Sequence, residues 1–365
     1  GRGIYILDDY SPLRSGNSEL NASATLFGVR DAWLYIPDDR RGWGGKGDWG
    51  TGRYTADNPP YGAVFSYYLP EALQSLKEQR QETEKETAKE GGDTPYPSWD
   101  ALRREDREES PAIILTVRDG AGKVVQRIEG PTGKGFHRVA WNMRYPAPDP
   151  VDLNPNTNLA PWQSPPQGPL ALPGQYSVTL TKRVEGQLTE LASAQTFALK
   201  PLFEGGLVTD DRKALLDIQM QTNDLYRAIT GANEARGEIQ GRIDHLLRAV
   251  TDTPAATESQ AQALRAINAR MQDLDVKLNG DSTIASRAEK VPMSISSRIG
   301  TIVYSHWDSQ SSVPGNLLDS YEIADTQFRG ALQELKSITA DLAALETELQ
   351  ADGAPWTPGR IPDWP

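Results

Sequence analysis

The chain has 365 residues, of which 38% are hydrophobic and 24% are charged, and its formal net charge at pH 7 is −12. This length exceeds one comfortable hydrophobic core, so two or three domains are expected, and no apolar run approaches the roughly 20 residues that span a bilayer. The acidic balance argues against a nucleic-acid-binding surface, and the absence of cysteine excludes disulfides, thiolate zinc sites and cysteine nucleophiles.

The first 58 residues combine short apolar stretches with a glycine-rich segment. We expect one strand at Ile4–Leu7 and a second that runs from Ala24 to Ile36. Residues 38–58 are predicted to be a loop, because glycine recurs through them without any apolar periodicity. Residues 1–58 are therefore interpreted as an entering strand and a glycine- and tryptophan-rich linker.

This linker carries the ligand-binding candidates of the sequence, which are Trp43, Asp48 and Trp49. Indole rings on a glycine-rich loop, with carboxylates nearby, suit stacking on sugar rings or a place in a protein interface. The simplest interpretation is that both tryptophans fill the seam between a β-domain and its neighbour. All three interpretations stay open at this point.

Residues 112–146 show the alternation of half-buried strands. The first strand places three apolar side chains on one face, namely Ile113, Leu115 and Val117. Asp119–Gly122 supplies residues that tolerate positive φ, which indicates a hairpin. Further strands are indicated around 124–128, 136–143, 173–182 and 188–199. Trp141 is expected to point into the core.

Hairpins with one apolar face need a second layer to cover them. The simplest arrangement over residues 59–200 is an immunoglobulin-like or fibronectin-like antiparallel β-sandwich. Residues 70–110 interrupt it, and their charges at helical spacing predict a solvated helix over 71–90 that is either a surface decoration or a partner-binding arm. Residues 147–172 contain seven prolines and are expected to form an extended surface crossing.

From residue 209 onward the apolar positions step alternately by three and four residues, as in amphipathic helices. Thr209 is the expected N-cap of the first helix. Its seam runs through 215–250 and includes Arg236, which requires an acidic partner if it faces another helix. This helix would be roughly 60 Å long, unless the three glycines within it interrupt it.

The same apolar step returns in two later stretches, 264–278 and 321–349. Together with a short helix expected over 294–307, these stretches favour an antiparallel three- to four-helix bundle over 201–353. Residues 354–365 contain four prolines and cannot be helical, so they either pack back or extend freely. The fold class predicted for the whole chain is α+β and multidomain, with a sandwich followed by a bundle.

Several stretches resemble the domain that follows the propeller in bacterial BNR-repeat, sortilin-like proteins. They are DGAGKVVQR from Asp119, GFHRVAWNMRYP from Gly135, PGQYSVTL from Pro173, GRGIYILDD from Gly1 and NPPYGAV from Asn58. Such proteins are often labelled glycosyl hydrolases because their propellers are similar to those of sialidases. The resemblance implies an upstream propeller in the same protein, a helical region after the sandwich, and export to the periplasm or the cell surface.

No reactive constellation is recognised on this chain. The sequence has no aspartate-box repeat and no recognisable carboxylate pair, so no catalytic residue is assigned and any glycoside hydrolase activity would belong to the upstream propeller. His137, His245 and His306 lack metal-ligand spacing, so packing or surface roles are expected and no metal or cofactor is predicted.

Three hypotheses for function follow from these observations. The favoured one is a non-catalytic C-terminal scaffold or interaction module of an exported propeller protein. The second is an accessory part of a glycoside hydrolase that helps to bind glycan. The third is a self-standing adhesion or assembly subunit. The partners expected are the upstream propeller and another protein or a glycan, without nucleic acid or a transmembrane segment.

The chain begins at Gly1 without methionine, so the absence of a signal peptide is uninformative.

Overall fold

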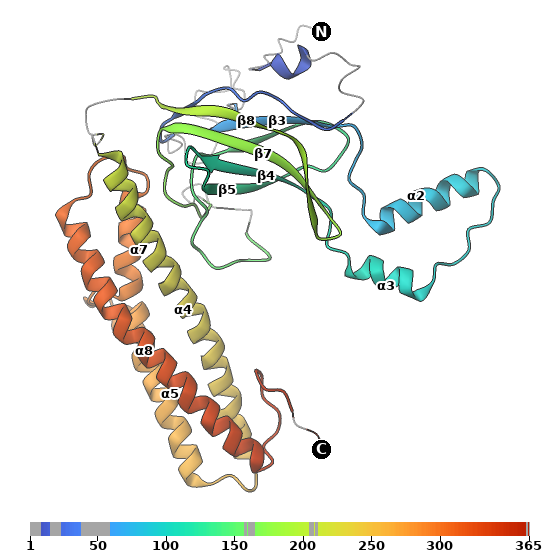
Figure 1. Ribbon diagram of the computed structural model, residues 1–365. Helices are drawn as coiled ribbons and strands as arrows, with labels where there is room; N and C mark the ends of the chain where they lie inside the picture. The colour runs from blue at the N-terminus through green and yellow to red at the C-terminus, as the bar shows by residue number, and fades with distance from the viewer. Residues whose placement is uncertain are drawn as a thin grey trace, which may run out of the picture. The chain divides into compact units, whose positions relative to one another are not determined.

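The computed structural model describes residues 9–14, 23–37, 59–156, 159, 165–203, 208, 211–362 and 364. The chain is an α+β protein that divides into two compact units. A strand unit comprises Gly1–Pro146 and Leu170–Glu204, and a helical unit comprises Ala147–Pro169 and Gly205–Pro365. Figure 1 shows the strands of the first unit and the long helices of the second. None of the described helices combines the length and the apolar character that crossing a bilayer demands.

The strand unit contains a three-stranded and a five-stranded sheet. The smaller sheet has the order β1-β3-β6, with bounds Thr25–Leu26, Ala63–Leu69 and Gly135–Trp141. The larger sheet has the order β2-β8-β7-β4-β5, with bounds Ala32–Leu34, Gln187–Pro201, Gly174–Val184, Ala112–Asp119 and Val124–Gly130. All neighbouring strands are antiparallel except β2 and β8, which run parallel.

The two sheets share one hydrophobic core. Alternate residues of β3 and β4 are buried in the same cluster, including Phe65 from the smaller sheet and Leu115 from the larger one. The indole of Trp141 lies in this core, 5.4 Å from the ring of Tyr176, and its Nε1 donates to the carbonyl of Arg144 at 2.9 Å. The prediction that Trp141 points into the core is confirmed. The pairing places the apolar face of each strand inward, as alternation requires.

The predicted strand from Ala24 to Ile36 was wrong, because this stretch forms two strands in different sheets. β1 pairs with β3, and β2 pairs with β8. Asp31 fixes the start of β2, since its carboxylate accepts the backbone N–H of Ala198 at 2.9 Å and an ion pair from Lys200 at 2.5 Å. The chain therefore passes from one sheet to the other between residues 27 and 31.

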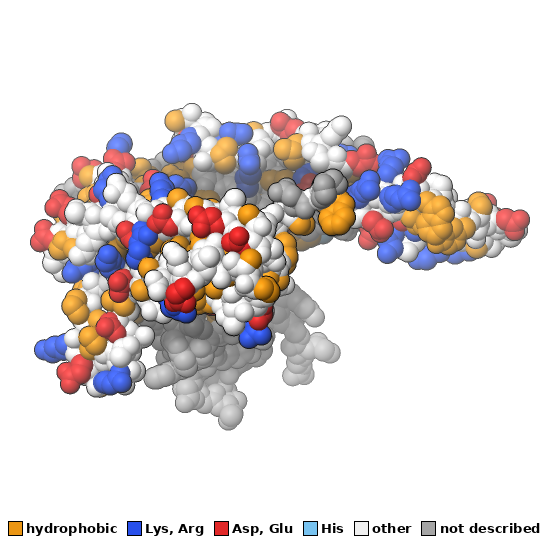
Figure 2. All heavy atoms as spheres, turned by 90° about the horizontal axis from the view of Figure 1, so that it is seen from below, with side chains coloured by type: hydrophobic (Ala, Val, Ile, Leu, Met, Phe, Trp, Pro, Cys, Tyr) orange, Lys and Arg blue, Asp and Glu red, His pale blue; other side chains and the backbone are white. Residues whose placement is uncertain are grey.

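The charged insertion forms two helices, α2 (Leu76–Lys89) and α3 (Trp99–Arg107), that project as an arm in Figure 1. One helix was predicted here, and the structure adds the second. Neither helix has a buried residue. They are joined by Arg80, which donates to both carboxylate oxygens of Glu105 at 2.6 and 2.8 Å. Figure 2 shows charged side chains of both signs along the arm, with an apolar patch among them.

The helical unit consists of α4 (Arg212–Asp252), α5 (Glu258–Asn279), α6 (Ser282–Ala285), α7 (Ile295–His306) and α8 (Gly315–Ala351). Figure 1 shows that α4 and α8 run in the same direction and that α5 runs in the opposite one. The predicted N-cap was misplaced. Asp211 caps α4 by accepting the N–H of Ala214 at 2.8 Å, whereas Thr209 lies outside the described residues. The glycines do not interrupt α4, which continues for 41 residues.

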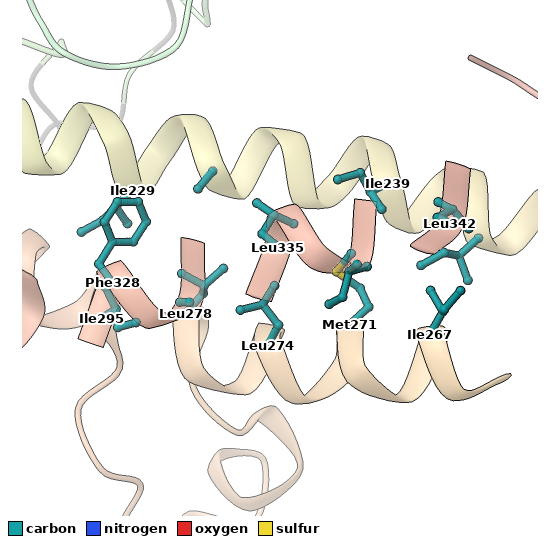
Figure 3. Packing of buried hydrophobic residues seen from close by; sticks show 14 of the residues in the cluster. Ile229, Ile239, Ile267, Met271, Leu274, Leu278, Ile295, Phe328, Leu335 and Leu342 are labelled. Carbon is teal, nitrogen blue, oxygen red and sulfur yellow. The ribbon is translucent and has the colours of Figure 1, made fainter. Parts of the chain in front are cut away.

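The apolar residues that recur at alternating steps of three and four line the core of this unit. Ile229 and Ile239 of α4 face Leu274 of α5 and Leu335 of α8 across it (Figure 3). Arg236, the charged residue on the seam, forms an ion pair with Asp275 of α5 at 3.3 Å. The expected acidic partner of Arg236 is therefore present.

The C-terminal tail packs back onto the helical unit, one of the two predicted alternatives. The backbone carbonyl of Arg360 accepts from Nε1 of Trp356 at 2.8 Å, and the guanidinium of Arg360 donates to the carbonyl of Glu346 at 3.2 Å. Thr357 is buried. The proline-rich segment Ala147–Pro169 also belongs to this unit, and its Asp149 accepts a hydrogen bond from Tyr226 at 3.2 Å.

Candidate binding groove

The face of the three-stranded sheet that points away from the main core carries its own aromatic cluster. Ser66 pairs with Arg138, and Tyr68 pairs with Phe136, so these four side chains share that face. The rings of Tyr68 and Phe136 lie 5.0 Å apart in an edge contact, and Phe27 stacks on Phe136 at 5.7 Å. An aromatic cluster outside the core marks this face as a candidate contact surface.

Two adjoining hollows lie along this face, and we call them together the outer-face groove. The larger has a volume of about 580 Å³ and is lined by Asp9, Arg30, Asp31, Ala32, Trp33, Tyr35, Pro59, Pro60, Tyr61, Gly62, Val64 and Arg138. The smaller measures about 360 Å³ and is lined by Asp9, Pro12, Leu13, Ser66, Phe136, His137 and Arg138. The two hollows share Asp9 and Arg138, and the guanidinium of Arg138 donates to the carbonyl of Asp9.

Large apolar side chains stand open to solvent along the groove. The exposed fraction is 56% for Trp33, 58% for Leu13 and 45% for Phe136. Trp33 is outward-facing because β2 buries its neighbours Ala32 and Leu34 and leaves the residue between them on the other face. Exposed rings and apolar chains at one place are typical of binding surfaces.

The charged groups of the groove are held by local hydrogen bonds. The pKa of Asp9 is lowered, first by the hydroxyl of Ser11, which donates to its carboxylate at 2.7 Å, and further by the nearby guanidinium groups. The pKa of Asp31 is lowered mainly by Lys200. Burial raises the pKa of Tyr61 to about 12, and its hydroxyl donates to the carbonyl of Tyr35. The carboxylates are therefore charged and the phenol neutral near pH 7.

This combination of groups is suited to binding. Aromatic faces and apolar walls take up planar or apolar ligand groups, while carboxylates and guanidinium groups at the rim form directed hydrogen bonds. Among the described residues there is no cluster of three or more histidine, aspartate or glutamate side chains that could hold a metal ion.

The candidates predicted from sequence, Trp43, Asp48 and Trp49, lie outside the described residues. The segment that contains them begins after Pro37 and ends before Pro59, and residues at both flanks line the groove. Sequence reasoning missed Trp33 and Tyr61. Their signal was available, because both are aromatic residues beside the glycine-rich segment.

The three histidines are dispersed. His137 lines the smaller hollow, and its Nε2 lies 2.6 Å from the carbonyl of Gly133. His245 is exposed on α4, and His306 is buried at the end of α7. They belong to separate places in the fold, and the groove includes only the first.

Comparisons of this chain with models of protein families, with curated proteins and with solved structures gave no match.

Proposed function

We propose that this chain is a non-catalytic scaffold and interaction module of a larger exported bacterial protein. In this proposal the strand unit is an immunoglobulin-like β-sandwich, the helical unit is an antiparallel bundle, and both follow a BNR-repeat, sortilin-like propeller. The shared core of the two sheets and the helical core support the architecture. The expectation of an upstream propeller and of export rests on the resemblance of the sequence motifs.

The observation that carries the proposal is the outer-face groove with its exposed Trp33, Leu13 and Phe136. When another domain covers such a surface, its apolar side chains are removed from water. This burial stabilises the association by about 25 cal/mol for each Å² of apolar area. Asp9 lines both hollows, so the groove adjoins the entering segment of the chain. The upstream domain is therefore the occupant that we propose.

The test begins with the full reading frame, in which blade repeats are expected before Gly1. The preceding segment and this chain are then produced as separate polypeptides, and their affinity is measured by calorimetry. A Trp33→Ala, Phe136→Ala double variant is expected to weaken binding at least tenfold. A Tyr96→Ala variant, which removes an exposed ring from the arm, is the matched control and should bind normally. A reading frame without blade repeats contradicts the proposal.

A second candidate function is glycan binding as an accessory part of a hydrolase. It is favoured by Trp33, an exposed indole beside the charged side chains of Arg30 and Arg138 in the larger hollow. Binding on a glycan array should then fall in Trp33→Ala, and also in the Trp43→Ala, Trp49→Ala double variant. Unchanged glycan binding in both variants contradicts this candidate.

A further inference from the structure

The helical unit contains a second hollow, which is unrelated to the outer-face groove. It lies between α5 and α8 and is closed by the segment 281–294 that connects α5 to α7. Its volume is about 690 Å³. Ile295 forms one wall of this hollow. It also belongs to the helical core, where it lies near Leu278 of α5 (Figure 3). We call it the α5/α8 pocket.

The lining of the pocket is mainly apolar and partly open to water. Its residues are Val276, Lys277, Gly280, Asp281, Ile284, Val291, Pro292, Met293, Ser294, Ile295, Gln327, Gly330, Ala331 and Glu334. Three of the apolar side chains have large exposed fractions, 45% for Val276, 40% for Ile284 and 45% for Met293. Such side chains gathered around a concavity are the usual lining of small-molecule sites.

The charged groups at the pocket are not equivalent. Glu334 is paired with Arg270 at 2.7 Å. The Asp281 carboxylate caps α6 by accepting the backbone N–H groups of Thr283 at 2.9 Å and Ile284 at 3.2 Å. Lys277, in contrast, has no ion-pair partner among the residues that the structure describes. The pocket therefore offers one uncommitted positive charge next to an apolar cavity.

The connecting segment gives the pocket a defined wall. Residues 282–290 are exposed, whereas Ser294 and Ile295 are buried, so the segment stands away from the helices and returns to them. Ala288 has φ of +57°, a conformation that residues with a Cβ adopt at a cost. Val291, Pro292 and Met293 follow this turn and line one side of the cavity.

We propose that the α5/α8 pocket binds a small amphipathic monocarboxylate, of the class of unbranched fatty acids. The alkyl chain lies against Val276, Ile284 and Met293, and the carboxylate pairs with Nζ of Lys277. The volume suits a small molecule, because ligand cavities measure roughly 300–1,000 Å³, whereas an α-helix about 10 Å wide exceeds it after a few residues. A negative head group is proposed because Lys277 has no partner within the pocket lining, whereas Asp281 and Glu334 already have partners.

The test uses the complete chain and dodecanoate below its micelle concentration, with binding measured by calorimetry. Saturable binding at one site is expected, and 1-dodecanol, which has the same alkyl chain without the charge, should bind about tenfold more weakly. Lys277→Ala should weaken dodecanoate about tenfold and leave dodecanol unchanged. Met293→Asp, which places a negative charge at the cavity wall, should weaken both ligands.

Lys336→Ala is the matched control, because Lys336 is exposed on α8 and does not line the pocket. It should leave both affinities unchanged. Hydrogen exchange should show protection of residues 281–294 when dodecanoate binds. The proposal is overturned if dodecanoate and dodecanol bind equally well, if Lys277→Ala and Lys336→Ala have the same effect, or if only an amphipathic peptide binds at this place.

Discussion

At the scale of single residues, the helical unit holds two charged or titratable groups in places that water does not reach. His306 is buried at the end of α7, and its backbone carbonyl accepts from Nε2 of Gln219 at 3.0 Å. Glu346 is buried on α8 and meets the guanidinium of Arg242 on α4. Both groups make the stability of this unit depend on charge.

Burial lowers the pKa of His306 below its ordinary value of 6.5, because a charged imidazole would lose its hydration. The unfolded chain therefore binds this proton more readily than the folded chain. The stabilisation is complete above pH 6.5 and is lost as the pH falls below that value. We expect the melting temperature to fall between pH 7 and pH 5, and His306→Asn should flatten this dependence. His245→Asn, on the exposed face of α4, should preserve it.

The Arg242–Glu346 pair provides a second residue-scale prediction. Arg242 donates from Nε at 3.1 Å and from Nη2 at 2.5 Å to the two carboxylate oxygens of Glu346. Arg242→Met leaves a buried carboxylate unpaired and is expected to cost about 3 kcal/mol of unfolding free energy. The double variant Arg242→Met, Glu346→Leu should recover most of that loss in urea titrations. A double variant that is no more stable than Arg242→Met would contradict this expectation.

At the scale of elements, α4 tolerates three glycines without breaking. A Cβ added at Gly231, Gly237 or Gly241 would meet no atom within 4 Å. Alanine at each position should stabilise the helix by about 0.5–1 kcal/mol, because it restricts the unfolded chain and favours helix. Gly280→Ala is the opposite control. Gly280 ends α5 with φ of +93°, so alanine at this position should lower the free energy of unfolding. Urea titration of the helical circular dichroism signal measures both effects.

The long elements could be predicted from sequence, and the reasons are physical. Leu and Ile at steps of three and four residues form a single apolar stripe along a helix, and this stripe must face the core. The buried faces of α4, α5 and α8 were therefore predicted from the sequence. The short strands β1 and β2 were not predicted correctly, because two or three residues are too few to show the alternation of a strand. β1 and β2 were joined into one strand, although Asp31 and its partners on β8 separate them.

The outer-face groove could not be predicted, because its residues come from distant segments. Which face Arg138 occupies depends on its pairing with Ser66, and that register is set by the fold rather than by the local sequence. Trp33 became exposed only because β2 joined the edge of the larger sheet. Trp43 and Trp49 lie outside the described residues, so their predicted role in binding stays a prediction.

At the scale of the whole molecule, the two hydrophobic cores have no residue in common within the described part of the chain. Each unit is therefore expected to lose its structure with its own free energy. Gly62→Ala tests this, because Gly62 has φ of +110° and a Cβ there would lie 1.9 Å from the carbonyl oxygen of Trp141. Hydrogen exchange should show lost protection in β3 and β6 and unchanged protection in α4, α5 and α8. A uniform loss across both units would contradict separate cores.

The proposal of an interaction module predicts that this chain alone does not assemble. Light scattering should give a monomer of 40.1 kDa over the micromolar range. A concentration-dependent dimer or larger species would favour the alternative of a self-assembling adhesion subunit. The Trp33→Ala, Phe136→Ala double variant then shows whether the outer-face groove is the surface involved.

The parallel pairing of β2 with β8 has a mechanical consequence. β2 lies near the start of the strand unit, and β8 is its last strand. When the chain is pulled from both sides, tension acts along these two strands in opposite directions and loads their hydrogen bonds together in shear. Separation in shear breaks every bond of the pair at once, whereas peeling breaks them singly. We therefore expect the strand unit to resist pulling better where β2 pairs with β8 than it would with an antiparallel pair at that edge.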